Sequence, residues 1–330
     1  MSEASAIPVR VGVVGLGGFG RLHAMTLAGL AEAKLVALVA RRQASVDALS
    51  EELPGVPGWL DLDLAMAESG AEAWVVASTT AMHVPLAERL LAAGFPVLVE
   101  KPLAGSLEEA ERLRGLVAPD SRNLMMGHIL LFNSEFRQLQ EEARRRGPLV
   151  HISCARHRPT ETLRNYPGES PFHLLMVHDL YMVLALVGRR EPVAFSAQAR
   201  WNAGGQCALA LAQMRWEDGL IASLAASYLS PEGMPADGYD RLEVFGEGWA
   251  ARVEANPRPL TVWDDRAHAP LTLEITPGPR QPAGMLAEEL RAFCRVVRGR
   301  QSAPPGATYA DALQVLRWLD RLEQAARALA

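Results

Sequence analysis

A glycine-rich segment near the start of the chain has the residue types and spacing needed to hold a dinucleotide. The motif G-x-G-x-x-G directly follows the apolar run 9–14 and precedes a helix-like segment. Gly15 would let the chain turn sharply, Gly17 would admit a pyrophosphate close to the backbone, and Gly20 would allow the helix to pack on the strand. The phosphates would lie at the helix N-terminus. The predicted cofactor contacts here are Gly15, Gly17, Gly18, Phe19 and Gly20.

The end of the second expected strand indicates which dinucleotide is bound. An NAD site usually has an acidic residue about 20 positions beyond the glycines, where it bonds the ribose 2′-OH. Here the strand ends at Ala40, and Arg41 and Arg42 follow. Arg41 offers donors for a 2′-phosphate and a plane that can stack on adenine. A solvated pair of arginines is the alternative, but the sequence favours NADP(H) over NAD(H).

Polar residues follow a third apolar strand, 73–77. They are Ser78, Thr79 and Thr80, with His83 close behind. Ligands of parallel sheets bind beyond the carboxyl ends of the strands, so all four are candidate cofactor contacts. For His83 an N-cap or packing role is the alternative.

The segment Glu100-Lys101-Pro102 follows a further apolar strand, 96–99. The strand would present the lysine and its two neighbours to the cofactor crevice. A partly desolvated lysine beside a cationic nicotinamide can have its pKa lowered enough for acid–base chemistry. A lysine in a surface salt bridge is the alternative.

Two patterns of elements must position these residues. Up to residue 127, strand-like runs that are apolar on both faces alternate with helix-like segments, which predicts an α/β, doubly wound parallel sheet of the Rossmann type. After residue 127, helices are expected at 133–146 and 172–187, and strand-like runs follow one another from 193 to 275. This predicts an α+β domain with a large, mostly antiparallel sheet. We therefore expect domains at 1–127 and 128–330, with a C-terminal helix, 308–329, that could pack back on the first.

Composition excludes several classes of protein. The 330 residues are 49% hydrophobic and 22% charged, with a net charge of −5, which argues against a dedicated nucleic-acid binder. The start has no basic segment before an apolar run, so we expect no signal peptide, and no apolar run suits a membrane span. Cys154, Cys207 and Cys294 lie far apart, without metal-ligand spacing. They indicate reduced thiols, no metal site and a cytoplasmic protein.

Taken together, these segments resemble one family over essentially the whole chain. The resemblance is carried by Gly15 to His23, Ser78-Thr79-Thr80 with His83, Ala93 to Ala104, Gly127-His128, Phe132-Asn133, His178-Asp179 and Phe245-Gly246. The chain resembles the Gfo/Idh/MocA-type oxidoreductases, which include glucose–fructose oxidoreductase and inositol dehydrogenase. The segment around Glu100-Lys101-Pro102 is the strongest single marker.

The resemblance implies a nicotinamide-dependent oxidoreductase that acts on CH–OH groups of a sugar, inositol or related polyol. It implies a Rossmann domain and a C-terminal domain whose open-faced sheet builds a homodimer or homotetramer. Lys101 would match the family's proton-transfer lysine, and His178 the second catalytic residue. The candidate substrate contacts are Lys101, His128, Arg158, Tyr166, His173 and His178.

The expected substrate helix departs from the family pattern. Many relatives have an acidic residue four positions before the histidine, where this chain has Leu174. His173 and Asp179 would face elsewhere on an α-helix. Either His178 works with Lys101 alone, or Tyr181 or His173 contributes, or the usual reaction is lost. The alternatives to a dehydrogenase are therefore a non-catalytic NAD(P)-binding sensor, or a lyase or glycosidase that uses tightly bound NAD transiently.

Overall fold

The computed structural model describes residues 7–329 except 167, 232–233, 235–237, 257–261, 264–266, 269–273 and 279–280. Parts of the strand-like run expected up to residue 275 therefore lie outside the described residues. The chain forms two compact units. The first comprises Met1–Ile129 and Ile275–Leu313, and the second comprises Leu130–Glu274 and Gln314–Ala330. The domain division expected at residues 127/128 stays a prediction.

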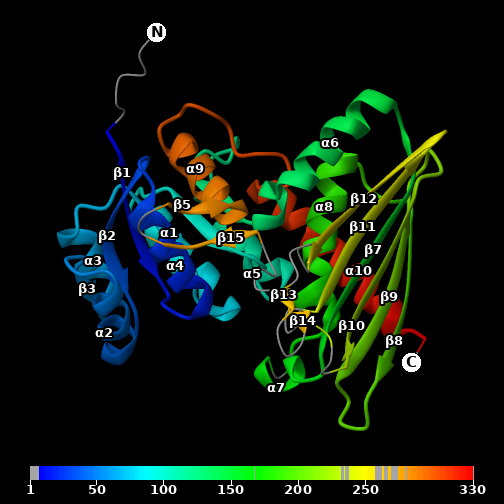
Figure 1. The fold of residues 1–330 in the computed structure, drawn as a ribbon, viewed down its shortest axis with the longest axis horizontal. Helices are drawn as coiled ribbons and strands as arrows, with labels where there is room; N and C mark the ends of the chain where they lie inside the picture. Colours follow the sequence, from blue (N-terminus) through cyan, green and yellow to red (C-terminus); the bar gives the residue numbers. More distant parts are fainter. Residues whose placement is uncertain are drawn as a thin grey trace. The chain divides into compact units, whose positions relative to one another are not determined.

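A six-stranded parallel sheet forms the centre of the first unit (Figure 1). Its strand order is β3-β2-β1-β4-β5-β6. The strands are β1 Val9–Val14, β2 Ala33–Val39, β3 Gly58–Trp59, β4 Ala73–Val76, β5 Val97–Glu100 and β6 Leu124–Gly127. Every residue of β4, β5 and β6 is buried, as expected for strands covered on both faces. The predicted doubly wound sheet is confirmed, and the strand order reverses between β1 and β4, where such sheets bind ligands.

Helices connect and cover these strands. They are α1 Gly18–Gly29, α2 Gln43–Glu52, α3 Leu62–Glu68, α4 Thr80–Ala92, α5 Leu107–Glu111 and α9 Met285–Val297. The 3₁₀ turn η1, Arg112–Gly115, follows α5. A short antiparallel pair of strands, β15 Ile275–Thr276 and β16 Ala283–Gly284, precedes α9. Side chains fix some helix starts. Asp61 accepts hydrogen bonds from the backbone amides of Asp63 and Leu64 at α3, and Ser106 accepts one from Glu109 at α5.

A second six-stranded sheet forms the second unit, in the order β12-β11-β7-β10-β9-β8. Its strands are β7 Leu149–Pro159, β8 Ala194–Trp201, β9 Cys207–Arg215, β10 Ile221–Ser230, β11 Tyr239–Gly246 and β12 Trp249–Asn256, and the short pair β13 Val262–Trp263 and β14 Ala267–His268 is separate. Only β7 and β10 pair in parallel; the other neighbours are antiparallel. This confirms the predicted, mostly antiparallel sheet.

Helices lie along one face of this second sheet (Figure 1). They are α6 Ser134–Arg146, α7 Thr162–Asn165, α8 Val177–Val187 and α10 Tyr309–Arg327, with the 3₁₀ turn η2 Ile129–Phe132 before α6. α10 belongs to the first unit up to Leu313 and to the second from Gln314. Along β9, buried Ala210, Ala212 and Met214 alternate with exposed positions. The sheet therefore has one covered face and one open face.

The helix expected at 172–187 differs from the prediction at its start. Phe172–Met176 forms a π-helical turn, η3, in which the Val177 amide donates to the Phe172 carbonyl, five residues earlier. α8 continues from Val177. The α-helical spacing assumed between Leu174 and His178 therefore does not hold in this turn, because a π turn contains an extra residue.

Within the described ranges, no helix combines the length and the apolar character needed to cross a bilayer.

Candidate functional site

A cavity of about 560 Å³ opens in the first unit where β1 and β4 end. It lies at the reversal of strand order, the position at which doubly wound sheets bind ligands. Its lining includes eight of the predicted cofactor contacts: Gly15, Gly17, Gly18, Phe19, Arg41, Arg42, Ser78 and Thr79. The structure thus brings together predicted contacts that come from three separate segments of the chain.

The glycines of the motif give this cavity its shape. Gly15 has a φ of +94°, a conformation that side chains disfavour, and a Cβ there would lie 2.6 Å from the Ser78 amide nitrogen. A Cβ on Gly20 would lie 1.8 Å from the Gly15 carbonyl oxygen. Gly15 therefore permits the turn, and Gly20 lets α1 pack tightly against it. Gly20 shapes the cavity without lining it.

The N-terminus of α1 faces this cavity with its backbone amides uncapped by side chains. Gly17 is the N-cap residue, and the first turn contains no acidic residue. Helix N-termini of this kind attract anions because the amide groups and the helix dipole both favour negative charge.

Two arginines border the cavity where β2 ends. Arg41 and Arg42 are both exposed, and both line it. The acidic residue nearest to them in the lining is Asp61, whose Oδ1 already accepts the two backbone amides at the start of α3, at 2.7 and 3.0 Å. The charged groups at this end of the cavity therefore favour an anionic ligand group.

Sequence reasoning missed several residues of the lining. Leu60, Asp61, Met82, Leu86 and Arg89 all contribute to it. Leu60 is 51% exposed and offers an apolar surface to a ligand in the cavity. Since β3 has only two residues, no clear strand pattern indicated that the loop after it would reach the cavity.

His83 is buried and joins two loops of the first unit. Its Nδ1 lies 2.7 Å from the Pro102 carbonyl oxygen, and its Nε2 lies 3.1 Å from the Ser78 carbonyl oxygen. Burial lowers the pKa of the imidazole. His83 does not line the cavity, and its contacts with two backbone carbonyl groups match the packing role given above as the alternative to a cofactor contact. Thr80, another predicted contact, is the first residue of α4 and also lies outside the lining.

Lys101 follows the carboxyl end of β5, as expected. It is half-buried, and its backbone amide donates to Glu100 Oε2 at 3.2 Å. The Lys101–Pro102 peptide bond is cis. Glu100, Lys101 and Pro102 do not line the cavity. His128 follows β6 and is completely buried in the same unit.

The other candidates belong to the second unit. His178 lies in the first turn of α8 and is half-buried, and Tyr181 is buried one turn later. Lys101 and His178, the predicted catalytic pair, therefore belong to different units. Tyr166, predicted to contact substrate, is 53% exposed and follows α7.

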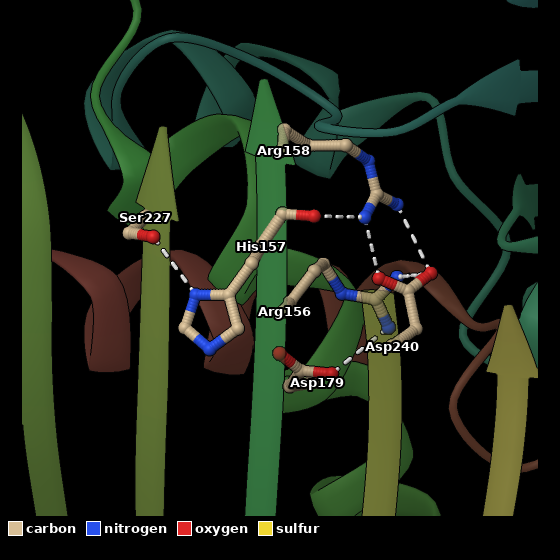
Figure 2. Close-up of polar contacts among 6 residues, drawn as sticks. All are labelled: Arg156, His157, Arg158, Asp179, Ser227 and Asp240. Atoms are coloured by element: carbon tan, nitrogen blue, oxygen red, sulfur yellow. Dashed lines mark hydrogen bonds and ion pairs between the residues drawn. The ribbon is translucent and has the colours of Figure 1, made fainter. Parts of the chain in front are cut away.

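A buried ion-pair network includes Asp179, the residue that follows His178 in the sequence; Figure 2 shows the side chains of this network. Arg156, from β7, donates to Asp179 Oδ1 at 2.9 Å and to Asp240 Oδ2 at 2.6 Å. Although burial opposes it, the two carboxylates raise the pKa of Arg156. Arg158 also donates to both oxygens of Asp240, at 2.6 and 3.0 Å. The guanidinium of Arg158, predicted to contact substrate, is thus engaged within the protein.

His173 is held by α10 in the second unit. Its Nε2 lies 3.0 Å from Glu323 Oε2. This hydrogen bond is the main reason that the pKa of Glu323 falls to about 2, with Arg327 contributing. His173 was predicted to contact substrate and was one of the residues considered in place of the acid missing at Leu174. Its Nε2 is instead engaged with the carboxylate of Glu323 on α10.

Two family models match consecutive parts of the chain. The model described as "Oxidoreductase family, NAD-binding Rossmann fold" matches residues 9–128, and the model of the GFO/IDH/MocA C-terminal domain matches residues 125–251. The two matches meet where the first parallel sheet ends, at β6.

Named relatives are similar over most of the chain. UDP-N-acetylglucosamine 3-dehydrogenase of Acidithiobacillus ferrooxidans is 28% identical over 86% of this chain and 84% of that protein. Inositol 2-dehydrogenase of Rhizobium meliloti is 27% identical over 77% of this chain and 78% of that protein. The solved structure of UDP-N-acetylglucosamine 3-dehydrogenase GnnA from Acidithiobacillus ferrooxidans superposes with a TM-score of 0.78, at 25% identity over 98% of this chain and 99% of that one.

Proposed function

Because the chain belongs to the Gfo/Idh/MocA oxidoreductase family, with its NAD-binding Rossmann domain, we propose that it transfers a hydride between a nicotinamide dinucleotide and a sugar, inositol or related polyol. The chain is an oxidoreductase acting on CH–OH groups, and the substrate class is the proposed part. The cavity at the ends of β1 and β4 is the observation that carries the proposal, because it combines the glycine turn, an uncapped helix N-terminus and two arginines.

The residues of the cavity fit a dinucleotide. Apart from the adjoining residues and the backbone of α1 itself, no described atom lies within 4 Å of the position that a Cβ would take on Gly17 or on Gly18, so the backbone is open to close approach there. The N-terminus of α1 would hold the pyrophosphate, and Thr79 and Ser78 would face the ribose. When bound, the nicotinamide supplies the hydride chemistry, and the protein supplies orientation and proton transfer.

Lys101 is proposed as the group that moves the proton of the reacting hydroxyl. Its place at the carboxyl end of β5 supports this role, since catalytic groups of doubly wound sheets lie beyond that edge. His178 is proposed as the second proton-transfer residue, held in the first turn of α8. The buried hydrogen bond from Arg156 holds Asp179, the residue that follows His178 in α8.

An absorbance screen tests the substrate class. The purified protein is mixed with NAD⁺ or NADP⁺ and with aldoses, inositols, sugar acids or nucleotide-linked amino sugars, and the reduced-nicotinamide band is followed. We expect turnover with at least one of these polyols. Turnover only with substrates that lack a sugar-like CH–OH group would contradict the proposal.

We propose NADP(H) as the preferred cofactor, because Arg41 and Arg42 border the cavity and no acidic residue follows β2 directly. Arg41→Ala is expected to weaken NADPH binding by about 1–3 kcal/mol, the scale of a charge-assisted hydrogen bond, and to leave NADH binding nearly unchanged. Titration of intrinsic tryptophan fluorescence measures both affinities. Arg144→Ala, which removes an exposed arginine of α6, is the control. Equal or tighter binding of NADH by the wild type would refute the preference.

We propose a homodimer or homotetramer that buries the open face of the second sheet. Exposed Leu211, Ile221, Leu229 and Phe245 lie on this face, and the register pairs Leu211 with Ala225 and Phe245 with His151. An apolar sheet face of this kind favours association. Light scattering should return a multiple of 35.8 kDa, and Ile221→Arg combined with Leu211→Glu should shift the protein toward that single-chain mass. A monomer at micromolar concentration would contradict the proposal.

A cytoplasmic location is also proposed, because Cys154, Cys207 and Cys294 are buried and unpaired with one another, which suits a reducing compartment.

A further inference from the structure

Three ionisable side chains meet in the interior of the first unit, next to the Lys101 segment. They are His23 from α1, Glu100 from β5 and Glu289 from α9, with exposed fractions of 0%, 6% and 0%. One nitrogen or oxygen of each lies within 4.8 Å of those of the other two. Ionisable side chains this deeply buried need a partner or must become neutral. The sequence analysis identified none of these contacts.

The contacts divide the three residues unequally. His23 Nε2 lies 2.7 Å from Glu100 Oε1, and the other oxygen of Glu100 accepts the backbone amide of Lys101 at 3.2 Å. By contrast, neither oxygen of Glu289 has a hydrogen bond of good geometry among the described residues. Glu100 thus has the partners that a carboxylate requires, and Glu289 does not.

Among the described residues, no cation is found in a contact with the Glu289 carboxyl. The elements packed against α9 are α1, which carries His23, and the strands β15 and β16, which contain no charged residue. His23 is engaged with Glu100. The His128 backbone amide donates to the Met126 carbonyl at 3.0 Å, and its proximity to Glu289 acts to lower the pKa of that carboxyl. Burial, reinforced by the negative charge of Glu100, raises the pKa of Glu289 well above its usual range. Two adjacent carboxyls in such a site cannot both ionise without a large electrostatic cost.

We propose that Glu100 and Glu289 form a carboxyl pair that shares one proton, and that this pair positions the Lys101 peptide group. His23 holds the ionised oxygen of the pair, and the proton on Glu289 lets the two carboxyls approach each other. The pair also adjoins the cofactor cavity, because Phe19, which lines it, packs edge-on against the His23 ring with centroids 5.4 Å apart. The inference that the pair shares a proton depends only on contacts within the first unit. The inference that the pair positions Lys101 for catalysis also rests on the proposed function.

The shared proton predicts how stability depends on pH. The folded state keeps a proton on Glu289 that the unfolded chain releases above about pH 4.5, the usual pKa of a glutamate. Stability is therefore lost as pH rises from that value toward the raised pKa of the folded state. Glu289→Gln carries no such proton, so its advantage over the wild type should grow with pH.

Thermal unfolding of the full chain between pH 5 and pH 8 measures this difference. We expect the melting temperature of Glu289→Gln minus that of the wild type to rise by roughly 2 °C per pH unit. The matched control is Glu288→Gln, because Glu288 is the preceding residue of α9 but is half-buried and pairs with Arg291 at 2.6 Å. Its difference from the wild type should not change with pH. A flat difference for Glu289→Gln would overturn the shared proton.

A bound cation could neutralise the same three side chains. To separate the two explanations, wild type and Glu289→Gln are dialysed against a chelator and then melted with and without Zn²⁺ or Mg²⁺. The shared proton predicts no metal-dependent rise for either protein. A rise for the wild type that Glu289→Gln lacks would replace the proton by a metal ion and overturn the inference.

Kinetics test the positioning role. Glu289→Met has a similar length but an apolar end, whereas Glu289→Gln keeps a neutral polar end of the shape of the protonated carboxyl. We expect Glu289→Met to lower kcat by about 10- to 100-fold through displacement of Lys101, with cofactor Kd nearly unchanged, and Glu289→Gln to recover most of the loss. Equal kcat for wild type and Glu289→Met would overturn the positioning role. A wild type without any hydride transfer would instead refute the proposed function, and the melting experiment would still decide the shared proton.

Discussion

Replacing Lys101 by methionine is expected to lower kcat by about 10²–10⁴-fold, the usual contribution of a general acid–base group. Methionine keeps the length and apolar stem of lysine but cannot carry a proton. Because Lys101 does not line the cofactor cavity, NADPH and NADH should bind the variant about as tightly as the wild type. Steady-state kinetics at saturating cofactor, together with fluorescence titration, measure the two effects separately.

Lys34→Met is a suitable control for this experiment, since Lys34 is an exposed lysine at the start of β2. It should leave kcat nearly unchanged. His178→Ala should cost less than Lys101→Met if the lysine alone moves the proton, and a similar amount if the two residues act as a unit. Wild-type turnover that survives the loss of Lys101 would refute the mechanism and leave the fold and the family membership intact.

Replacing Asp240 by asparagine is expected to destabilise the second unit by about 3–5 kcal/mol, the cost of leaving a buried charge without its partner. Asp240 is 1% exposed and accepts hydrogen bonds from both Arg156 and Arg158 (Figure 2). Asparagine preserves the shape of the side chain but removes the negative charge that both guanidinium groups share. Denaturant unfolding followed by far-UV circular dichroism measures the loss.

The control is Glu141→Gln on α6. Glu141 pairs with Arg144 at 2.8 Å, but both side chains are more than half exposed. Exposed pairs of this kind contribute about 0–1 kcal/mol, so the control should be nearly neutral. A similarly small effect for Asp240→Asn would mean that the network in Figure 2 does not stabilise the fold.

The first unit was predictable because its signals are local. A parallel sheet covered on both faces appears in the sequence as short apolar runs, and the G-x-G-x-x-G turn identifies the strand and helix on either side of it. Of the residues expected after strand ends, Arg41 and Thr79 line the cavity, whereas Lys101, which follows β5, does not. His83, inside α4, contacts two backbone carbonyl groups and also lies outside the lining.

The contacts of Glu289 could not be predicted from sequence. The residue lies 189 positions after Glu100, and next to Glu288 it has the pattern of a solvated helix face. Only the tertiary packing of α9 distinguishes the buried Glu289 from the half-buried Glu288. The engagement of Arg158 by Asp240 was hidden similarly, because the two strands that carry them are far apart in the chain yet adjacent in the sheet.

The π turn η3 makes the direction of His178 depend on the number of residues before it, as well as on their types. Each residue of an α-helix turns the chain by about 100°, so one residue gained or lost in this turn would rotate the start of α8 by that angle. Every side chain could be kept while the histidine came to face a different direction. The insertion or deletion of a single residue could therefore change how a related enzyme orients this histidine toward its substrate. A comparison of residue types alone would miss such a change.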